Sequence, residues 1–431
     1  MEMLKYMHKK KHYNQSLKYL NDKYSKRNTL YDYIFKRIRW KDLFFHQNKT
    51  AVAIRNLIKQ KKYTVNRIKT FRITINGKER EIGIFNGFDI IVSKVISQYL
   101  ETHLDHIFID NLYSYRPGKN IQQAKHNICT YIKHNINNNK KQDLYVFQAD
   151  ISNYTNSIST HNNAPIWNIL FNALNTINKT LDPYIKETLV NLTRPKSIDK
   201  RSGREYVSIK GLAMGTPTTN VIANLYLNEV DHSINNIDNS FYVRYGDDII
   251  FMHPDKNKVI EVSRYIKNEF EKLGLKLNKD KEKFSNFNRA GRSEDKTFIG
   301  TSTINYIGYG FNANGHAGVK KGKVSKLKNM IRRRLIRVKN LTRGLSPEEK
   351  ARIMSEHINN TMQSDSKEAE YYANQISKID DKDRINQLNK IIENEIAECS
   401  VNHNSKQKIE HLKLNIIRPA LIPVQDIEWS D

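Results

Sequence analysis

Cysteines, uncharged apolar runs and acidic side chains are all scarce in this sequence. The chain of 431 residues has two cysteines, so it can form neither a disulfide framework nor a cysteine-rich zinc site. The N-terminal segment lacks the apolar core of a secretory signal peptide. No uncharged apolar stretch reaches the roughly 18 residues that a membrane-spanning helix requires. We therefore expect a cytoplasmic protein without a membrane partner.

Basic residues far outnumber acidic ones. The chain has 72 Lys and Arg residues against 45 Asp and Glu residues, which gives a formal net charge of +27. An excess of this size is typical of proteins with a polyanionic partner, either nucleic acid or an acidic membrane surface. A compositional bias toward lysine would produce the same excess. Aromatic residues make up 10% of the chain, which argues against wholesale disorder.

Two segments have the pattern of β-hairpins, and a third has that of a buried strand. In Phe71–Phe85 the turn is Asn76-Gly77, the strongest short-range hairpin signal because both residues tolerate positive φ. In Phe241–Met252 two apolar arms flank Tyr245-Gly246-Asp247-Asp248. The segment Leu144–Ser152 predicts a buried strand that ends in an acid.

Helix-like spacing of apolar residues marks both ends of the chain. Residues 1–70 are basic with this spacing and predict an N-terminal helical extension. Between Lys320 and Arg343 eleven residues are Lys or Arg and none is acidic. Apolar residues from Val324 to Leu341 recur there at steps of three and four, which predicts an amphipathic helix with a basic outer face. Such a face fits nucleic-acid phosphates, or is an ordinary solvated surface.

Three aspartates are the strongest candidates for chemistry. Asp247 and Asp248 lie at the tip of the second predicted hairpin, and Asp150 lies near the end of the predicted buried strand. Carboxylates from separate strand ends can hold a pair of Mg²⁺ ions together with substrate phosphates. Ions held there would activate a 3′ hydroxyl and stabilise a leaving pyrophosphate. By itself, an Asp-Asp pair in a turn is more often part of a solvated loop.

Seven ordered segments between Phe71 and Phe311 accompany these aspartates. They are Lys78-Glu79-Arg80-Glu81-Ile82-Gly83-Ile84-Phe85, Ser114-Tyr115-Arg116-Pro117-Gly118-Lys119, Asp150-Ile151-Ser152-Asn153-Tyr154, Gly211-Leu212-Ala213-Met214-Gly215-Thr216-Pro217 with Asn224-Leu225-Tyr226-Leu227, Tyr245-Gly246-Asp247-Asp248, Leu273-Gly274-Leu275-Lys276-Leu277-Asn278 with Lys281, and Tyr306-Ile307-Gly308-Tyr309. In this order they resemble the motifs of the bacterial reverse transcriptases of group II introns, retrons and defence systems. The resemblance implies an α+β right-hand polymerase with fingers, an antiparallel palm sheet and a helical thumb.

The resemblance also implies roles in metal binding and proton transfer. Asp150 and Asp247 would be metal ligands, with Asp248 a weaker ligand and Ile151 a further ligand position. Two Mg²⁺ ions, or Mn²⁺ in their place, would be the cofactors. Lys281 would donate a proton to pyrophosphate, although it lies in a charge run typical of an exposed surface.

Other residues of the motifs are implied to bind substrate. Lys78 and Arg80 would clamp the incoming triphosphate, for which arginine offers a bidentate fork. Arg116 has two interpretations, a nucleotide contact or a salt bridge. Gly215 belongs to the region that packs against the nascent base pair in this family. Tyr154 would collide with a 2′ hydroxyl and so select deoxynucleotides, unless it only packs in the core.

Departures from the family pattern favour one subclass of reverse transcriptase, and several alternative functions stay open. A viral RNA-dependent RNA polymerase would carry an acid where this chain has Thr155, and Met214 stands where the family has Gln. The Val-Thr-Gly and Asn-Ala-x-x-His boxes of retrons are absent. These features favour a stand-alone enzyme of anti-phage defence that copies a dedicated non-coding RNA. The rivals are a retron enzyme, a template-independent or protein-templated DNA polymerase, and an inactive palm kept as an RNA-binding scaffold.

The predicted organisation has three parts. They are an N-terminal helical extension at 1–70, fingers and palm at 71–311, and a helical thumb with the C-terminal region at 312–431. The predicted partners are a non-coding RNA template, its DNA product and dNTPs. A second copy of the chain and an accessory defence protein are further candidates.

Overall fold

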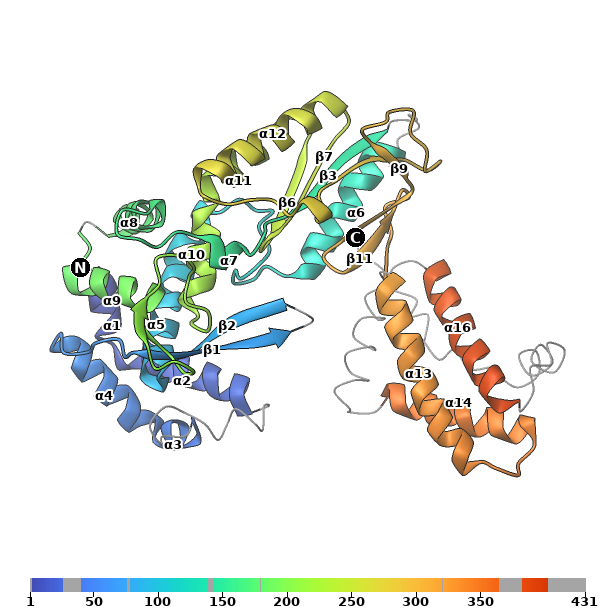
Figure 1. The fold of residues 1–431 in the computed structure, drawn as a ribbon, viewed down its shortest axis with the longest axis horizontal. Helices are drawn as coiled ribbons and strands as arrows, with labels where there is room; N and C mark the ends of the chain where they lie inside the picture. Colours follow the sequence, from blue (N-terminus) through green and yellow to red (C-terminus); the bar gives the residue numbers. More distant parts are fainter. Residues whose placement is uncertain are drawn as a thin grey trace. The chain divides into compact units, whose positions relative to one another are not determined.

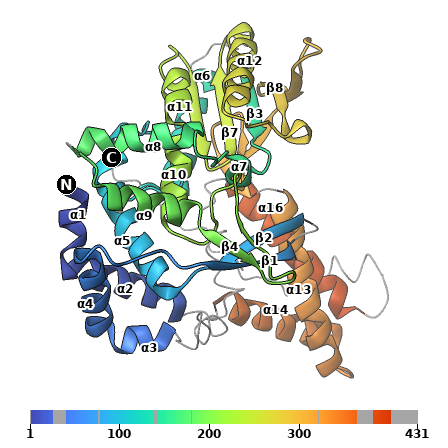
Figure 2. The same cartoon turned by 60° about the vertical axis from the view of Figure 1, so that its left-hand side comes forward.

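The computed structural model divides the protein into two units. It describes residues 2–25, 40–75, 78–137, 143–178, 180–319, 321–363 and 382–401. The first unit comprises residues 1–120 and 146–283, and the second comprises residues 121–145 and 284–431. Figure 1 and Figure 2 show the helices and strands of each unit.

Helix α5 is the central helix of the first unit. The N-terminal elements are α1 (Glu2–Met7), α2 (Lys10–Ser25), α3 (Trp40–Phe45), α4 (Gln47–Lys59) and α5 (Gly87–Leu104), and further along the chain are η2 (Asp105–Ile107), α7 (Tyr154–Ser157), α8 (Pro165–Ile177), α9 (Pro183–Thr193), α10 (Thr218–Tyr226), α11 (Asn228–Asn235), α12 (Lys256–Lys272) and η3 (Lys279–Lys281). α5 contacts α1, α2, α8 and α10. Its side chains are buried on nearly every side, as expected of a helix enclosed by others. The N-terminal helices predicted from apolar spacing are therefore present; α1 and α2 pack on α5, and α3 and α4 pack on α2.

The first predicted hairpin is confirmed, and two further strands extend it into a sheet. The strands are β1 (Ile68–Ile75), β2 (Lys78–Ile84), β4 (Lys196–Asp199) and β5 (Glu205–Val207). β1 and β2 pair antiparallel, with Ile75 opposite Lys78. The predicted turn residues, Asn76 and Gly77, lie outside the described residues. β4 pairs parallel with β1, so the strand order is β2-β1-β4-β5.

The predicted buried strand and the second predicted hairpin lie side by side. The strands are β3 (Leu144–Asp150), β6 (Phe241–Tyr245) and β7 (Asp248–His253), in the spatial order β6-β7-β3. β6 and β7 pair antiparallel from Phe241 opposite Met252 to Tyr245 opposite Asp248. α11 contacts β6 and α12 contacts β7. Both predictions are confirmed, and Asp150 is the last residue of its strand.

The second unit combines short strands with a group of three helices. Its elements are α6 (Ile121–Asn137), β8 (Lys283–Phe287), β9 (Ile299–Thr301), β10 (Thr303–Tyr306), β11 (Tyr309–Asn312), β12 (Ala317–Val319), α13 (Lys321–Leu341), α14 (Pro347–Gln363) and α16 (Lys382–Ser400). β10, β11 and β12 form an antiparallel sheet in that order. Each of α13, α14 and α16 contacts the other two.

Helix α13 is the predicted basic amphipathic helix. Ile331, Leu335 and Val338 are buried, and cationic residues such as Arg333 and Arg337 are exposed. Leu341 was expected on the apolar face but is 86% exposed, because the helix ends at this residue. Among the residues that the structure describes, no helix is long and apolar enough to span a membrane.

Candidate active site

Backbone hydrogen bonds bring three chain segments together at the end of β3. The Ile151 N–H donates to the Asp247 carbonyl at 3.0 Å, which joins the strand end to the β6–β7 turn. The Ser152 N–H donates to the Lys276 carbonyl at 2.8 Å, and the Asn278 N–H donates to the Asp150 carbonyl at 2.8 Å. The aspartates of separate motifs are therefore held at one place by main-chain contacts.

Lys281 supplies a positive charge at this place. Its Nζ lies 2.5 Å from Asp150 Oδ2, while Asp150 is 7% exposed. The hydrogen bond to Asp150 is the main cause that raises the pKa of Lys281, and the charges of Asp150, Asp248 and Asp247 act in the same direction, against partial burial. The structure thus pairs Lys281 with Asp150, and the charges of Asp247 and Asp248 also act on it.

The side chains near Lys281 include carboxylates, which are of the type that binds divalent cations. The carboxylates of Asp150, Asp247 and Asp248 act together on one cationic group, and carboxylate oxygens are the ligands that Mg²⁺ prefers. Within the described part of the chain, no three acidic, His or Cys side chains already stand close enough to form a metal centre. In this structure Asp150 is paired with Lys281 instead.

The turn that carries Asp247 depends on glycine and on a buried arginine. Gly246 has φ 67°, which glycine adopts without steric cost. Arg244, two residues earlier, is fully buried and pairs with Asp231 of α11, with Nε to Oδ1 at 2.9 Å and Nη2 to Oδ2 at 2.5 Å. Burial opposes the charged form, but the hydrogen-bonded Asp231 carboxylate outweighs it and raises the pKa of Arg244.

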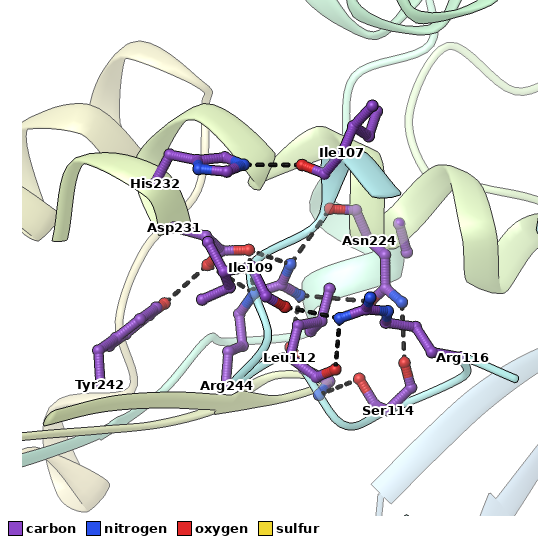
Figure 3. A network of polar contacts seen from close by, with 12 residues as sticks. Ile107, Ile109, Leu112, Ser114, Arg116, Asn224, Asp231, His232, Tyr242 and Arg244 are labelled. Carbon is purple, nitrogen blue, oxygen red and sulfur yellow. Dashed lines mark hydrogen bonds and ion pairs between the residues drawn. The ribbon is translucent and has the colours of Figure 1, made fainter. Parts of the chain in front are cut away.

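The remaining donors of Arg244 fasten the turn to two other segments. Nη1 donates to the Gly246 carbonyl at 3.3 Å, and Nη2 donates to the Asn224 carbonyl at 3.1 Å. The Asn224 amide donates to the Ser114 carbonyl at 2.9 Å, and Ser114 Oγ accepts the Gly246 N–H at 2.8 Å. Figure 3 shows this network. Arg244 and Asp231 were not predicted from the sequence, although an arginine inside an otherwise apolar strand was a usable signal.

Of the two roles predicted for Arg116, a nucleotide contact or a salt bridge, the structure shows the salt bridge. Nε and Nη2 donate to the Asp105 carboxylate at 2.8 and 3.1 Å, and Nη2 also donates to the Asp105 carbonyl at 3.0 Å. Nη1 donates to the carbonyls of Ile109 and Leu112 at 2.6 and 3.2 Å. A guanidinium has five N–H donors, so every donor of Arg116 is engaged within the protein.

Tyr154 is packed beneath this network. It opens α7, is 6% exposed and donates its hydroxyl to the Ala223 carbonyl of α10. Burial raises the pKa of Tyr154 far above its usual value. The ring is therefore held at a fixed place two residues beyond Ser152, in the segment that follows Asp150.

Gly215 lies against the β1–β2 hairpin. Its φ is 115°, and a Cβ added there would stand 3.4 Å from the Gly83 carbonyl oxygen. Main-chain pairing places Lys78 and Arg80 on β2 opposite Ile75 and Ile73. The side chains of Lys78 and Arg80 lie outside the described part of the structure, so their predicted triphosphate contacts stay predictions.

The sequence profile of the family described as reverse transcriptase (RNA-dependent DNA polymerase) matches residues 58–311. This match covers more than half of the chain, and the protein therefore belongs to the reverse transcriptase family. The predicted α+β right-hand polymerase fold is confirmed, whereas the bacterial subclass stays a prediction. Reverse transcriptase domains generally use divalent metal ions. No curated relative matches the sequence.

Solved structures of yeast telomerases show a weak likeness. Telomerase from Candida albicans in complex with a fragment of telomeric RNA has a TM-score of 0.49 and 14% identity, over 83% of this chain and 65% of that chain. An apo telomerase from Candida tropicalis truncated from its C-terminal domain has a TM-score of 0.46 and 13% identity, over 64% of this chain and 60% of that chain. This chain thus spans less than two thirds of either.

Proposed function

We propose that this protein synthesises DNA on an RNA template by adding deoxynucleotides to a 3′ hydroxyl. The observation that carries the proposal is the convergence of Asp150, the Asp247 turn and Lys281 at the end of β3, in a chain of the reverse transcriptase family. The reaction transfers the α-phosphoryl group of a dNTP to the 3′ oxygen and releases pyrophosphate.

The carboxylates of Asp150, Asp247 and Asp248, with the Ile151 main chain, would hold two Mg²⁺ ions, or Mn²⁺ in their place. Bound Mg²⁺ would favour the ionised 3′ hydroxyl and neutralise charge on the phosphates. Lys281, already at Asp150, would hold a proton for the departing pyrophosphate.

The substrate would be recognised by residues of the fingers hairpin and of α7. Lys78 and Arg80 lie on β2 and would bind the triphosphate. Tyr154 would lie beneath the sugar, as the family resemblance implies, and the hydrogen bond to Ala223 would hold its ring in place. Arg116 would hold the segment from Asp105 to Arg116 in place, since its donors bind Asp105 and the carbonyls of Ile109 and Leu112.

The Asp247→Asn variant tests the metal-binding role. We expect dNTP incorporation on a primed RNA template to fall by more than about 100-fold. Mutation of a residue that only hydrogen-bonds a metal ligand costs about 10- to 100-fold, and loss of a ligand itself should cost more. Asp22→Asn, which alters an exposed aspartate of α2, is the matched control and should incorporate like the wild type. Wild-type incorporation by Asp247→Asn would refute the metal-binding role, and RNA binding without incorporation by the wild type would identify an RNA-binding scaffold.

Tyr154 offers a separate test of sugar selection. We expect Tyr154→Val to lower the ratio of dNTP to rNTP kcat/KM by about 10-fold or more, because the ring that excludes a 2′ hydroxyl is gone. Tyr154→Phe keeps the ring and should keep the ratio. An unchanged ratio in Tyr154→Val would mean that the ring only packs in the core.

We further propose that the template is a dedicated non-coding RNA and that the product acts in anti-phage defence. The motif resemblance to stand-alone bacterial reverse transcriptases supports this role. Sequencing of the nucleic acid bound to purified protein, before and after addition of dNTPs and Mg²⁺, tests it. A covalent RNA–DNA hybrid would identify a retron enzyme, and repetitive DNA made without RNA would identify a template-independent or protein-templated polymerase.

A further inference from the structure

Tyr115 lies in the segment between Leu112 and Arg116 and has an unusual backbone conformation. Its φ is 57°, in the left-handed region where a bulky residue is a genuine outlier. Such outliers persist only where the surrounding structure imposes them, and they cluster at active sites and ligand contacts. The structure around Tyr115 shows both the constraint and a candidate ligand position.

Both neighbours of Tyr115 are held by hydrogen bonds. Ser114 accepts the Gly246 N–H at its Oγ and the Asn224 amide at its carbonyl. Arg116 is 8% exposed and engages all five donors. The backbone between these residues cannot relax to a right-handed conformation without breaking buried contacts.

The ring of Tyr115 is exposed beside the catalytic turn. Tyr115 is 58% exposed, whereas Tyr113, two residues earlier, is 2% exposed. Partial burial of the phenol, followed by the charges of Tyr245 and Asp247, raises the pKa of Tyr115. The Gly246 N–H also donates to Oγ of the adjacent Ser114 at 2.8 Å, so Tyr115 lies next to the turn that carries Asp247, while much of the residue faces solvent.

We propose that Tyr115 stacks on the terminal base of the growing DNA strand and so holds the 3′ hydroxyl beside Asp247. This inference rests on the proposed DNA synthesis. An aromatic ring suits this position because stacking accepts any base, and a growing strand ends in each base in turn. The hydrogen bond from the Gly246 N–H to Ser114 Oγ ties the stacking residue to the turn, so the base and the carboxylate keep a fixed spacing.

A primer with 2-aminopurine as its 3′-terminal base reports this contact, because stacking quenches its fluorescence. The duplex with RNA template is titrated with protein in the absence of nucleotides. We expect quenching with the wild type and Tyr115→Phe, and its loss with Tyr115→Ala together with a dissociation constant raised about 5- to 150-fold. Tyr19→Ala, which alters a tyrosine 48% exposed on α2, should bind and quench like the wild type.

Tyr115→Gly separates the ligand contact from fold stability. Glycine adopts φ 57° without steric cost, so its melting temperature should equal or exceed that of the wild type while duplex binding weakens as in Tyr115→Ala. If Tyr115→Gly lowered both the melting temperature and the affinity for the duplex, the claim that the backbone at Tyr115 is strained would be overturned.

Unchanged binding and quenching in Tyr115→Ala would overturn the stacking contact. A response seen only when 2-aminopurine stands in the template would also overturn it. In both cases primer extension by the wild type would leave the proposed DNA synthesis standing. A wild type that neither binds nor extends the duplex would instead refute that function.

Discussion

The ion pair between Arg244 and Asp231 is the contact whose removal we expect to have the largest consequence. The side chains are 0% and 1% exposed, and three hydrogen bonds of 2.5 to 3.0 Å join them. Asp231→Ala leaves a buried guanidinium without its counter-charge, which costs about 3–5 kcal/mol. At about 2–4 °C per kcal/mol for a unit of this size, the melting temperature should fall by about 6–20 °C.

Urea unfolding followed by circular dichroism measures this loss of free energy. The matched control is Glu205→Ala, which removes the ion pair with Arg67. That pair has an N–O distance of 2.6 Å, but its side chains are 57% and 52% exposed. An exposed pair contributes about 0–1 kcal/mol, so the control should unfold close to the wild type.

The double variant Arg244→Met/Asp231→Leu separates stability from positioning of the turn. Replacing both buried partners by apolar residues is often neutral or stabilising. The buried Tyr242 hydroxyl still loses Asp231 as its acceptor, so the free energy of unfolding should recover to within about 1–3 kcal/mol of the wild type. The contact from Arg244 to the Gly246 carbonyl stays lost, however, and we expect kcat about 10- to 100-fold below the wild type with little change in KM. Restored stability accompanied by wild-type kcat would refute the positioning role. A double variant as unstable as Asp231→Ala, or a fully stable Asp231→Ala, would refute the energetic reasoning.

Two further predictions concern a buried acid and a glycine. Burial raises the pKa of Asp89 from 3.8 to about 6; the protonated form therefore favours folding, and stability should fall by about 3 kcal/mol as the pH rises from about 4 to 6. Urea unfolding across this range should show a smaller decrease for Asp89→Asn, and an identical pH profile would contradict the assignment. Gly215→Ala should cost about 1–3 kcal/mol in a thermal melt, because φ is 115° and the new Cβ would lie 3.4 Å from the Gly83 oxygen. Gly203→Ala, with φ 71° and open space, should cost less, and equal losses would count against the steric argument.

Local sequence patterns were enough to predict those helices and strands that depend only on residues close together in the chain. The hairpins at Phe71–Phe85 and Phe241–Met252 follow from alternation and turn chemistry, which depend only on neighbouring residues. The basic face of α13 likewise follows from spacing along one helix. Asp150, Asp247 and Asp248 were predicted from their places at strand ends and at the hairpin tip, and the ordered motifs around them predicted the family.

Contacts between distant segments were decided by the tertiary structure alone. Lys281 binds Asp150 although 131 residues separate them in the sequence, and the spacing of residues along the chain does not predict such a contact. Arg116 remained ambiguous because a guanidinium serves a nucleotide or a carboxylate equally well, and only the surrounding carbonyls decide which. Arg244 and Asp231 could pair only where folding removes both from water and supplies partners for each. The sequence by itself determined the elements and the chemical groups, because these depend on local bonding; the tertiary structure decided which groups are buried, paired and held in place.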